Sequence, residues 1–271
     1  MRNRIIMRAG VLFAAAVTVW ITARTLARES SALPPSTITA RNAAAPLRIL
    51  PLGDSITHAD ANHLGYRYRL WVKLVDAGID FDLIGSLRSN HLGNPQWPLY
   101  KGRLFDRDHE GHWGWRADEI LSGPAGQEKD KLSEWLKGYT PDIVLIHLGT
   151  NDILRHQKVA ETVDELKQIM VVLRADNPRV IILLAKLIPT RAAPINAWIE
   201  KLNARIVQMS ASASTDQSPV IIVDQYSGFE AQDIDASDWL HPTPSGEEKM
   251  AAKWFEAIQG CVKGTRNTDE E

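Results

Sequence analysis

The chain has 271 residues, of which 44% are hydrophobic, and its formal net charge at pH 7 is −2. This length and composition suit one sizeable domain with short appendages. The near-neutral charge provides no basic field of the kind that attracts nucleic acid, so we expect no nucleic-acid partner. The single cysteine, Cys261, excludes an intrachain disulfide and a cysteine-based zinc site.

The first residues have the composition of an export signal. Three arginines within the first eight residues precede the apolar stretch 9–23, and no acidic residue occurs before Glu29. We predict that residues 1–27 form a signal peptide or a signal anchor, with a frayed cytosolic N-terminus as the alternative. The apolar stretch is shorter than the ~20 residues of a typical spanning helix, which favours cleavage. If the segment is retained, residues 5–23 would tether the protein to a membrane. A signal of either kind predicts a secreted or extracytoplasmic protein.

Residues 28–45 contain prolines and small polar residues without apolar periodicity, which predicts a linker. In residues 46–263, apolar runs typical of strands alternate with amphipathic stretches typical of helices. The predicted strands are Leu47–Leu52, Phe81–Gly85, Ile143–Leu148, Val180–Ala185 and Val220–Asp224. The predicted helices are Tyr66–Ala77, Gln127–Lys137, Val159–Ala175, Pro194–Ser210 and Ser245–Gln259. Residues 264–271 are predicted to be a disordered tail.

The alternation predicts an α/β fold: a three-layer α/β/α sandwich around a parallel five-stranded sheet. In open sheets of this kind, ligands bind beyond the carboxyl ends of the strands. Two polar motifs directly follow predicted strands, Gly53–Ser55 after the first and Gly149–Asp152 after the third. We therefore expect the functional residues at this edge of the sheet.

Ser55, Asp238 and His241 are of the residue types that together support nucleophilic catalysis. A serine hydroxyl needs an imidazole to take its proton and a carboxylate to fix the tautomer of that imidazole. In the Asp-x-x-His spacing, the Asp238 carboxylate can reach Nδ1 of His241 while Nε2 faces the serine. The Asn151 side-chain amide could donate to a developing oxyanion. These residues predict a serine hydrolase with Ser55 as nucleophile, His241 as general base and Asp238 as the residue that orients it.

Each of these residues also has a structural alternative. Ser55 could cap the helix that follows the first strand. Asn151 could close the turn after its strand. His241, which precedes Pro242, could lie in a loop and bind nothing.

Four segments together resemble the signature blocks of the SGNH (GDSL-type) hydrolases: Gly53–Ser55, a glycine within His109–Trp115, Gly149–Asp152 and Asp238–Pro242. Three further segments look like the carbohydrate esterase family 3 branch: Tyr66–Trp71, Asp80–Ser86 and Asp108–Arg116. The resemblance implies a flavodoxin-like fold over roughly residues 48–257. It also implies deacetylation of xylan as the activity.

The resemblance implies an oxyanion hole as well. Its donors would be the backbone N–H groups of Ser55 and Gly114 and the side-chain amide of Asn151, with Gly111 as the alternative to Gly114. The nucleophile block continues as Ile56–Ala59, where relatives commonly have an acidic residue and a glycine. This departure leaves the shape of the pocket beside Ser55 open.

Other residues near these blocks are candidates for contact with substrate or metal. Trp113 and Trp239 could stack on sugar rings, with buried packing as the alternative. His109, Glu110 and His112 could support their loop, contact substrate or bind a metal. No third protein ligand is identifiable, and a serine with its own base needs no metal-activated water, so we expect no metal and no cofactor.

The sequence as a whole predicts an extracytoplasmic serine esterase that removes acetyl groups from carbohydrate. Its partner would be an acetylated polysaccharide or another small acyl ester. One alternative is a lipid esterase or thioesterase of the lysophospholipase type in the same superfamily. The other is a glycan-binding protein that keeps the fold without catalysis.

Overall fold

The computed structural model describes residues 45–266, with side chains as far as residue 262. The predicted signal segment and the linker up to residue 44 lie outside the described residues, as do residues 267–271. The last helix runs to Arg266 and so includes the first three residues of the predicted tail. Among residues 45–266, no helix is long and apolar enough to cross a membrane.

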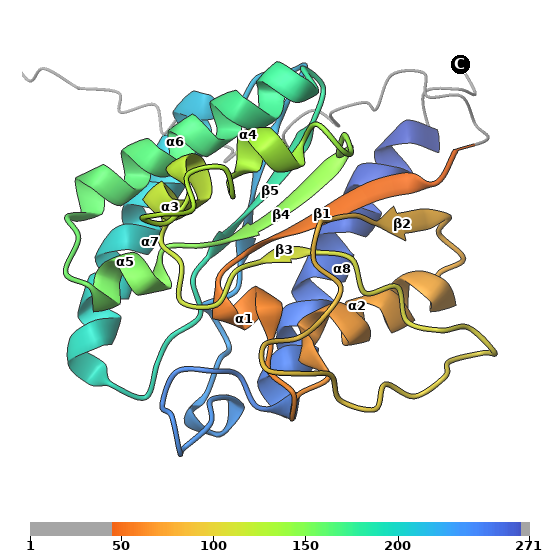
Figure 1. Ribbon diagram of the computed structural model, residues 1–271, viewed down its shortest axis with the longest axis horizontal. Coiled ribbons are helices and arrows are strands. Elements are labelled where there is room, and N and C mark those ends of the chain that lie inside the picture. The colour runs from red at the N-terminus through yellow and green to blue at the C-terminus, as the bar shows by residue number, and fades with distance from the viewer. Residues whose placement is uncertain (1–44, 267–271) are drawn as a thin grey trace, which may run out of the picture. The chain divides into compact units, whose positions relative to one another are not determined.

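Strands and helices alternate along the chain (Figure 1). The strands are β1 (Leu47–Gly53), β2 (Phe81–Leu83), β3 (Glu110–Gly111), β4 (Ile143–His147), β5 (Ile181–Lys186) and β6 (Val220–Asp224). The helices are α1 (Ser55–His58), α2 (Gly65–Asp76), α3 (Ala117–Ser122), α4 (Leu132–Trp135), α5 (Thr150–Leu154), α6 (Val159–Asp176), α7 (Ala193–Ala213) and α8 (Pro244–Arg266). A 3-10 helix, η1 (Ala231–Asp233), precedes α8.

The strands form one parallel sheet in the order β2-β1-β4-β5-β6, and the short β3 pairs with β1. Without β3, this is the 2-1-3-4-5 order of flavodoxin-like folds, in which ligands bind where the strand order reverses. That reversal lies between β1 and β4. The predicted parallel five-stranded sheet is confirmed, with β3 as an additional two-residue strand.

Helices cover both faces of the sheet (Figure 1). Because side chains alternate along a strand, neighbouring residues of β1 enter different cores. Leu50 packs in the core formed with α3, α4, α6 and α7, whereas Ile49 packs in the core formed with α2 and α8. Val144 and Leu145 of β4 divide in the same way. The predicted three-layer sandwich is therefore confirmed.

The predicted helix Gln127–Lys137 is wrong over its first half. Only α4 (Leu132–Trp135) is helical, and Gln127–Lys131 forms successive turns. These five residues are all polar and none of them is buried, so no packing supports a helix there. The buried part of the segment begins at Leu132, where helix packing against α3 and α6 begins.

The carboxyl end of β1 is the most crowded place in the sheet. Gly53 lies in register with Gly111 of β3 on one side and with His147 of β4 on the other. A Cβ atom on Gly53 would lie 2.4 Å from the His147 carbonyl oxygen and 2.4 Å from Oγ1 of Thr57. A Cβ atom on Gly111 would lie 2.5 Å from the His58 nitrogen. Two glycines thus allow α1 to start directly on the end of the sheet.

Asp54 is the residue that begins this helix. Its Oδ1 accepts a hydrogen bond of 3.0 Å from the Ile56 N–H, which caps α1. The side chain is completely buried. Burial raises the pKa of the Asp54 carboxyl to about 7; the Ile56 hydrogen bond opposes this shift, and the nearby charge of Asp152 adds to it.

We expect Gly53→Ala to lower the free energy of unfolding by about 1–3 kcal/mol, the range for overpacking of a tight site. Urea denaturation gives the value. Gly260→Ala is the matched control, because Gly260 lies in α8 with no atom within 4 Å of its added Cβ. That change should leave stability unchanged or raise it by about 0.5–1 kcal/mol. Equal stability of the two variants would contradict the contacts described for Gly53.

We also expect the stability of the protein to depend on pH through Asp54. Its pKa of about 7 lies above the unfolded value of 3.8, so the folded state binds the proton more tightly. Stability from this group is therefore full at low pH and is lost as the pH rises toward 7. Asp54→Asn keeps a cap acceptor but does not titrate. From about pH 5 to about pH 8, the wild type should lose at least about 1.4 kcal/mol of unfolding free energy relative to Asp54→Asn. Parallel pH profiles of the two proteins would contradict this.

Candidate active site

Ser55 stands at the carboxyl edge of the sheet, as the first residue of α1 and two residues beyond the end of β1. Its side chain is buried, with 4% of the residue exposed. The capping of this helix turn is provided by Asp54, not by the Ser55 hydroxyl. The hydroxyl is therefore free for another partner, and the structural alternative of Ser55 as the cap does not apply.

That partner is His241, 186 positions further along the chain. Nε2 of His241 lies 2.8 Å from Oγ of Ser55, and Nδ1 lies 2.7 Å from Oδ2 of Asp238. If Nδ1 donates its hydrogen to the carboxylate, Nε2 is the lone-pair nitrogen and accepts from the serine hydroxyl. The structure thus brings together the three residues that the sequence analysis expected to meet.

The Asp238 carboxyl is well placed to stay charged. Oδ1 accepts hydrogen bonds of 3.0 Å from the backbone N–H groups of Leu240 and His241. Partial burial disfavours the charge, but these bonds and the His241 imidazole outweigh it and lower the pKa of Asp238. A charged carboxylate holds the imidazole in one tautomer and one orientation.

The loop that carries Asp238 and His241 is anchored to the start of α8. The buried carboxylate of Asp233 accepts hydrogen bonds from the Glu230 N–H, the Ser245 hydroxyl and the Lys249 ammonium. Within the loop, the Asp235 N–H donates to the His241 carbonyl at 2.8 Å. His241 is therefore held by hydrogen bonds within its own loop and by the attachment of that loop to the start of α8.

Trp113 contacts the imidazole of His241 face to face. The two ring centroids lie 4.7 Å apart with an interplanar angle of 22°, and His91 also stacks on Trp113, with ring centroids 4.2 Å apart. Trp113 lines the pocket above Ser55, and its stacking on a sugar ring stays a prediction. Trp239 is 41% exposed and does not line the pocket above Ser55; its contact with substrate stays a prediction.

The expected oxyanion donors follow three strands that are in register. Gly53, Gly111 and His147 pair side by side at the ends of β1, β3 and β4. Ser55, Gly114 and Asn151 come two, three and four residues after them. The register of the sheet therefore brings the three donors to one edge.

Gly114 fits the donor role better than its alternative, Gly111. The Gly111 N–H already donates to Nδ1 of His109 at 2.9 Å, whereas the Gly114 N–H has no acceptor in the part of the chain that the structure describes. Gly114 has a φ of +78°, a conformation that favours glycine. Nη2 of Arg155 donates to the Gly114 carbonyl at 2.7 Å and fixes this peptide.

Asn151 lies in the first turn of α5 and is 9% exposed. One N–H of its amide donates to the Trp115 carbonyl at 3.0 Å. This bond ties the end of β4 to the loop that carries Gly114. The second amide N–H has no acceptor among residues 45–266, so it remains available to a ligand.

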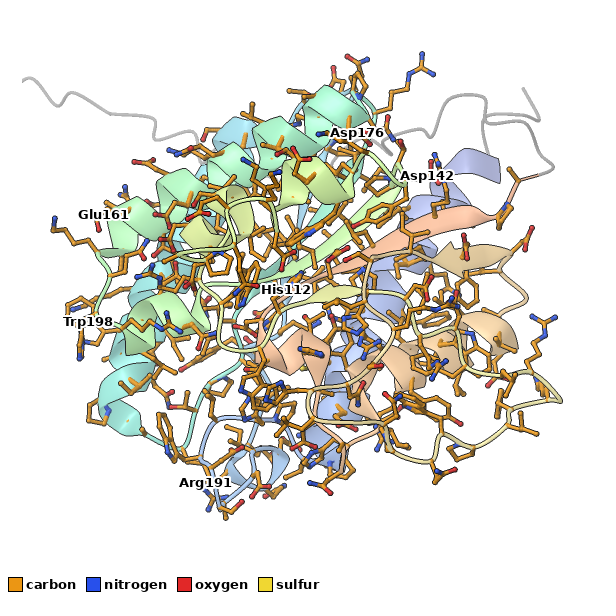
Figure 2. All side chains as sticks on the ribbon, viewed as in Figure 1. His112, Asp142, Glu161, Asp176, Arg191 and Trp198 are labelled. Carbon is orange, nitrogen blue, oxygen red and sulfur yellow. The ribbon has the colours of Figure 1, made fainter. Side chains whose placement is uncertain are left out.

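His109, Glu110 and His112 support this loop from inside the domain. The buried carboxylate of Glu110 accepts from the Ser86 N–H and from the Tyr139 hydroxyl, and Oε2 lies 2.9 Å from Nε2 of His112. The His112 ring, labelled in Figure 2, stacks on both Trp115 and Trp135. Across residues 45–266, no group of three His, Cys, Asp or Glu side chains could hold a metal ion.

The pocket above Ser55 also contains residues that the sequence analysis did not single out. Its polar lining comprises Ser55, Asp60, His63, His241 and Glu247; its apolar lining comprises Ile56, Ala59, Trp113 and Pro242. Nδ1 of His63 lies 2.8 Å from Oδ1 of Asp60. The repeated Asp-x-x-His spacing was visible in the sequence, but spacing alone did not place the pair beside Ser55.

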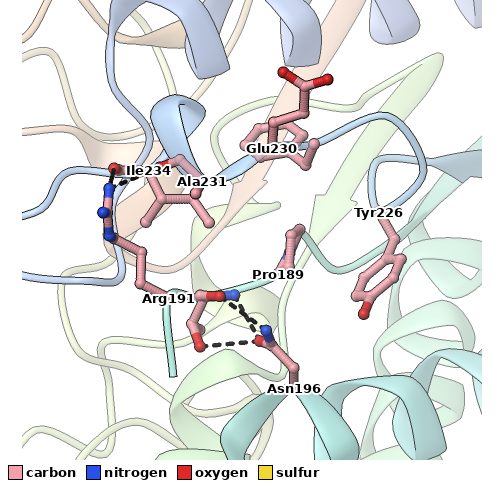
Figure 3. Close-up of a pocket in the computed structure, with 9 residues that line it drawn as sticks. Pro189, Arg191, Asn196, Tyr226, Glu230, Ala231 and Ile234 are labelled. Carbon is pink, nitrogen blue, oxygen red and sulfur yellow. Dashed lines mark hydrogen bonds between the residues drawn. The ribbon is translucent and has the colours of Figure 1, made fainter. Parts of the chain in front are cut away.

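A second pocket, of about 420 Å³, lies between the segment after β5 and the segment after β6 (Figure 3). Arg191 donates through Nη1 to the carbonyl groups of Ala231 and Ile234. Its backbone N–H donates to the Trp239 carbonyl at 2.9 Å. One wall of this pocket is therefore bonded to the loop that carries His241.

Known proteins are similar to this chain over most of its length. A multidomain esterase from Ruminococcus flavefaciens is 30% identical over 261 residues, which cover 90% of this chain and 32% of that protein. This chain therefore spans about a third of that curated relative's length.

Solved structures are similar over most of the domain. A carbohydrate esterase family 3 protein from Talaromyces cellulolyticus is 30% identical, with a TM-score of 0.68 over 80% of this chain and 98% of that chain. An acetyl esterase variant crystallised with an acetate ion is 29% identical, with a TM-score of 0.67 and the same two coverages, 80% and 98%. A family 3 carbohydrate esterase from Clostridium thermocellum is 27% identical, with a TM-score of 0.65, again over 80% and 98%.

The family match covers residues 52–249, from the end of β1 into α8. It includes Ser55, the segments after β3 and β4 that contain Gly114 and Asn151, and the loop with Asp238 and His241. The chain belongs to the GDSL-like lipase/acylhydrolase family.

Proposed function

We propose that the protein is a serine esterase whose catalytic residues are Ser55, His241 and Asp238. The observation that carries this proposal is the continuous hydrogen-bonded series from Oγ of Ser55 through His241 to Asp238, at 2.8 and 2.7 Å. A nucleophile within hydrogen-bond reach of a base, which is itself oriented by a third group, is the arrangement that acyl transfer requires. The names of the relatives as esterases support the same reaction.

The roles follow from the geometry. Oγ of Ser55 attacks the ester carbonyl carbon while Nε2 of His241 takes the hydroxyl proton, and Asp238 stabilises the resulting imidazolium. The negative oxygen accepts hydrogen bonds from the N–H groups of Ser55 and Gly114 and from the Asn151 amide. His241 then gives its proton to the departing alcohol. Water, deprotonated by His241, attacks the acyl-enzyme and releases the acid and Ser55.

An acetylated carbohydrate is the substrate that the surroundings support best. Three of the structural relatives are named as acetyl or family 3 carbohydrate esterases at 27–30% identity. Both pockets at this edge have polar and charged residues in their lining, including His63 and Glu247 in one and Arg191 and Glu230 in the other. These groups can hydrogen-bond a hydroxyl-rich ligand, and the pocket above Ser55, at about 10 Å³, is too small for a long acyl chain.

The proposed place of action is outside the cytoplasm. This part of the proposal rests on the arginine-rich start of the chain and the apolar stretch 9–23. Retention of the segment would tether the enzyme to a membrane, and its cleavage would release it. Amino-terminal sequencing of the exported protein distinguishes the two.

Ser55→Ala should reduce acetate release from acetylated xylan by at least about 1,000-fold, because the nucleophile is lost. Ser133→Ala, at an exposed position of α4, is the matched control and should retain full activity. Acetate release is compared with hydrolysis of short-chain and long-chain nitrophenyl esters. Preference for long chains with xylan untouched would indicate a lipid esterase, and an active Ser55→Ala would contradict the proposed nucleophile.

Asn151→Ala should lower kcat by about 100- to 1,000-fold with little change in KM, because its amide acts on charge that exists only in the transition state. Asn151→Asp keeps the shape of the side chain but replaces the donor with a carboxylate. Its loss should be at least as large. Steady-state kinetics on one acetyl ester gives both values, and a loss confined to KM would contradict the oxyanion role.

A further inference from the structure

Two Asp–His pairs lie at the pocket above Ser55, whose lining includes both histidines and Asp60 but not Asp238. The first is Asp238 with His241, and the second is Asp60 with His63, which has the same three-residue spacing. The mechanism proposed above uses only the first pair. The second pair begins at Asp60, directly after Ile56–Ala59, the residues at which the nucleophile block departs from the pattern of its relatives.

The second pair is held rigidly by buried groups. The amide of Asn90, which is 3% exposed, donates to the carbonyl oxygens of both Asp60 and His63 at 2.9 Å. The buried guanidinium of Arg67 donates to the Asn90 side-chain oxygen at 2.7 Å. The Asn62 N–H closes the turn by donating to Oδ1 of Asp60 at 2.8 Å. His63 is therefore fixed in position and not a mobile loop side chain.

His63 presents one ring nitrogen that is not bonded. Its Nδ1 lies 2.8 Å from the Asp60 carboxylate, so in the neutral ring the hydrogen sits on Nδ1 and Nε2 is an acceptor. Among residues 45–266, Nε2 has no hydrogen-bond partner, and the side chain is 23% exposed. Both oxygens of Glu247, another polar group of the pocket, are already bonded, to the Gly65 N–H and to Nε of Arg69.

The pocket lies on the leaving-group side of Ser55. Its lining includes His241, which gives its proton to the departing alcohol, but neither Gly114 nor Asn151, which face the oxyanion. The pocket has a volume of about 10 Å³, so a single hydroxyl group of the alcohol part, and not a whole sugar ring, can enter it.

We propose that Nε2 of His63 accepts a hydrogen bond from a hydroxyl group next to the ester oxygen of the substrate. His63 is thereby a specificity residue for monoacetylated vicinal diols, such as a sugar with an acetyl group beside a free hydroxyl. This inference rests on the proposed function, because it assumes attack by Ser55 on an acetylated sugar.

The test uses three substrates: a monoacetylated methyl pentopyranoside with a free neighbouring hydroxyl, the same compound with that hydroxyl O-methylated, and 4-nitrophenyl acetate. His63→Phe keeps a planar ring but removes both nitrogens. It should lower kcat/KM for the free-hydroxyl sugar by about 3- to 10-fold, the range for one hydrogen bond. The loss on 4-nitrophenyl acetate, which has no neighbouring hydroxyl, should be smaller by that factor, and circular dichroism checks that the variant is folded.

O-methylation should cost the wild type a similar factor and should cost His63→Phe nothing further. His63→Gln, whose side-chain oxygen can accept the same bond, should retain most of the preference. His156→Phe is the matched control, because His156 is exposed and outside the pocket, and it should behave as the wild type.

Equal losses of kcat/KM on all three substrates, or a wild-type kcat/KM that O-methylation does not change, would overturn the role of His63 but not the proposed function. A wild type that cleaves 4-nitrophenyl acetate but neither sugar would overturn the proposed carbohydrate substrate, and the inference with it. An inactive Ser55→Ala on the free-hydroxyl sugar confirms that the measured release comes from this site.

Discussion

The absence of a side chain at Gly53 is the constraint on which the site depends. The end of β1 is enclosed by β3, β4 and the first turn of α1, and the His147 carbonyl and the Thr57 hydroxyl occupy the space that a Cβ would need. The close packing at Gly53 places the carboxyl ends of β1, β3 and β4 side by side. The loop with Gly114 and the helix with Asn151 then start beside Ser55, because each follows a strand that is in register with Gly53.

The site is stiffened by polar groups that the domain buries. Asp54, Glu110 and Asp152 are completely buried beside the strand ends. Burial raises the pKa of Asp54 to about 7 and that of Asp152 to about 6, so holding them charged costs free energy. The Asp152 carboxylate accepts a hydrogen bond from the Ala117 N–H at the start of α3. The Glu110 carboxylate is hydrogen-bonded to Ser86, His112 and Tyr139. These contacts connect segments that are distant in sequence.

Much of this arrangement could be predicted from the sequence, where a long apolar period or a chemical requirement was present. The apolar runs of β1, β4 and β5 predicted the sheet. Ser55, Asp238 and His241 were expected to lie together because a serine nucleophile needs a base and a carboxylate that orients the base. Elements stabilised by tertiary contacts alone were missed: β3 has two residues, and α3 and α5 have six and five. The helix predicted from Gln127 failed because its polar first half has nothing to pack against. Asp60 and His63 were missed because a short polar turn has no periodicity that places it in space.

The separation of 186 positions between Ser55 and His241 has a consequence for how the protein matures. His241 lies between β6 and α8, so during synthesis it is added to the chain only after every strand of the described sheet. A growing chain or an amino-terminal fragment carries the serine without its base. Under the proposed mechanism, reactivity of the Ser55 hydroxyl is thus a chemical marker of a chain that extends past His241, and shorter chains would not react with the esters that they meet.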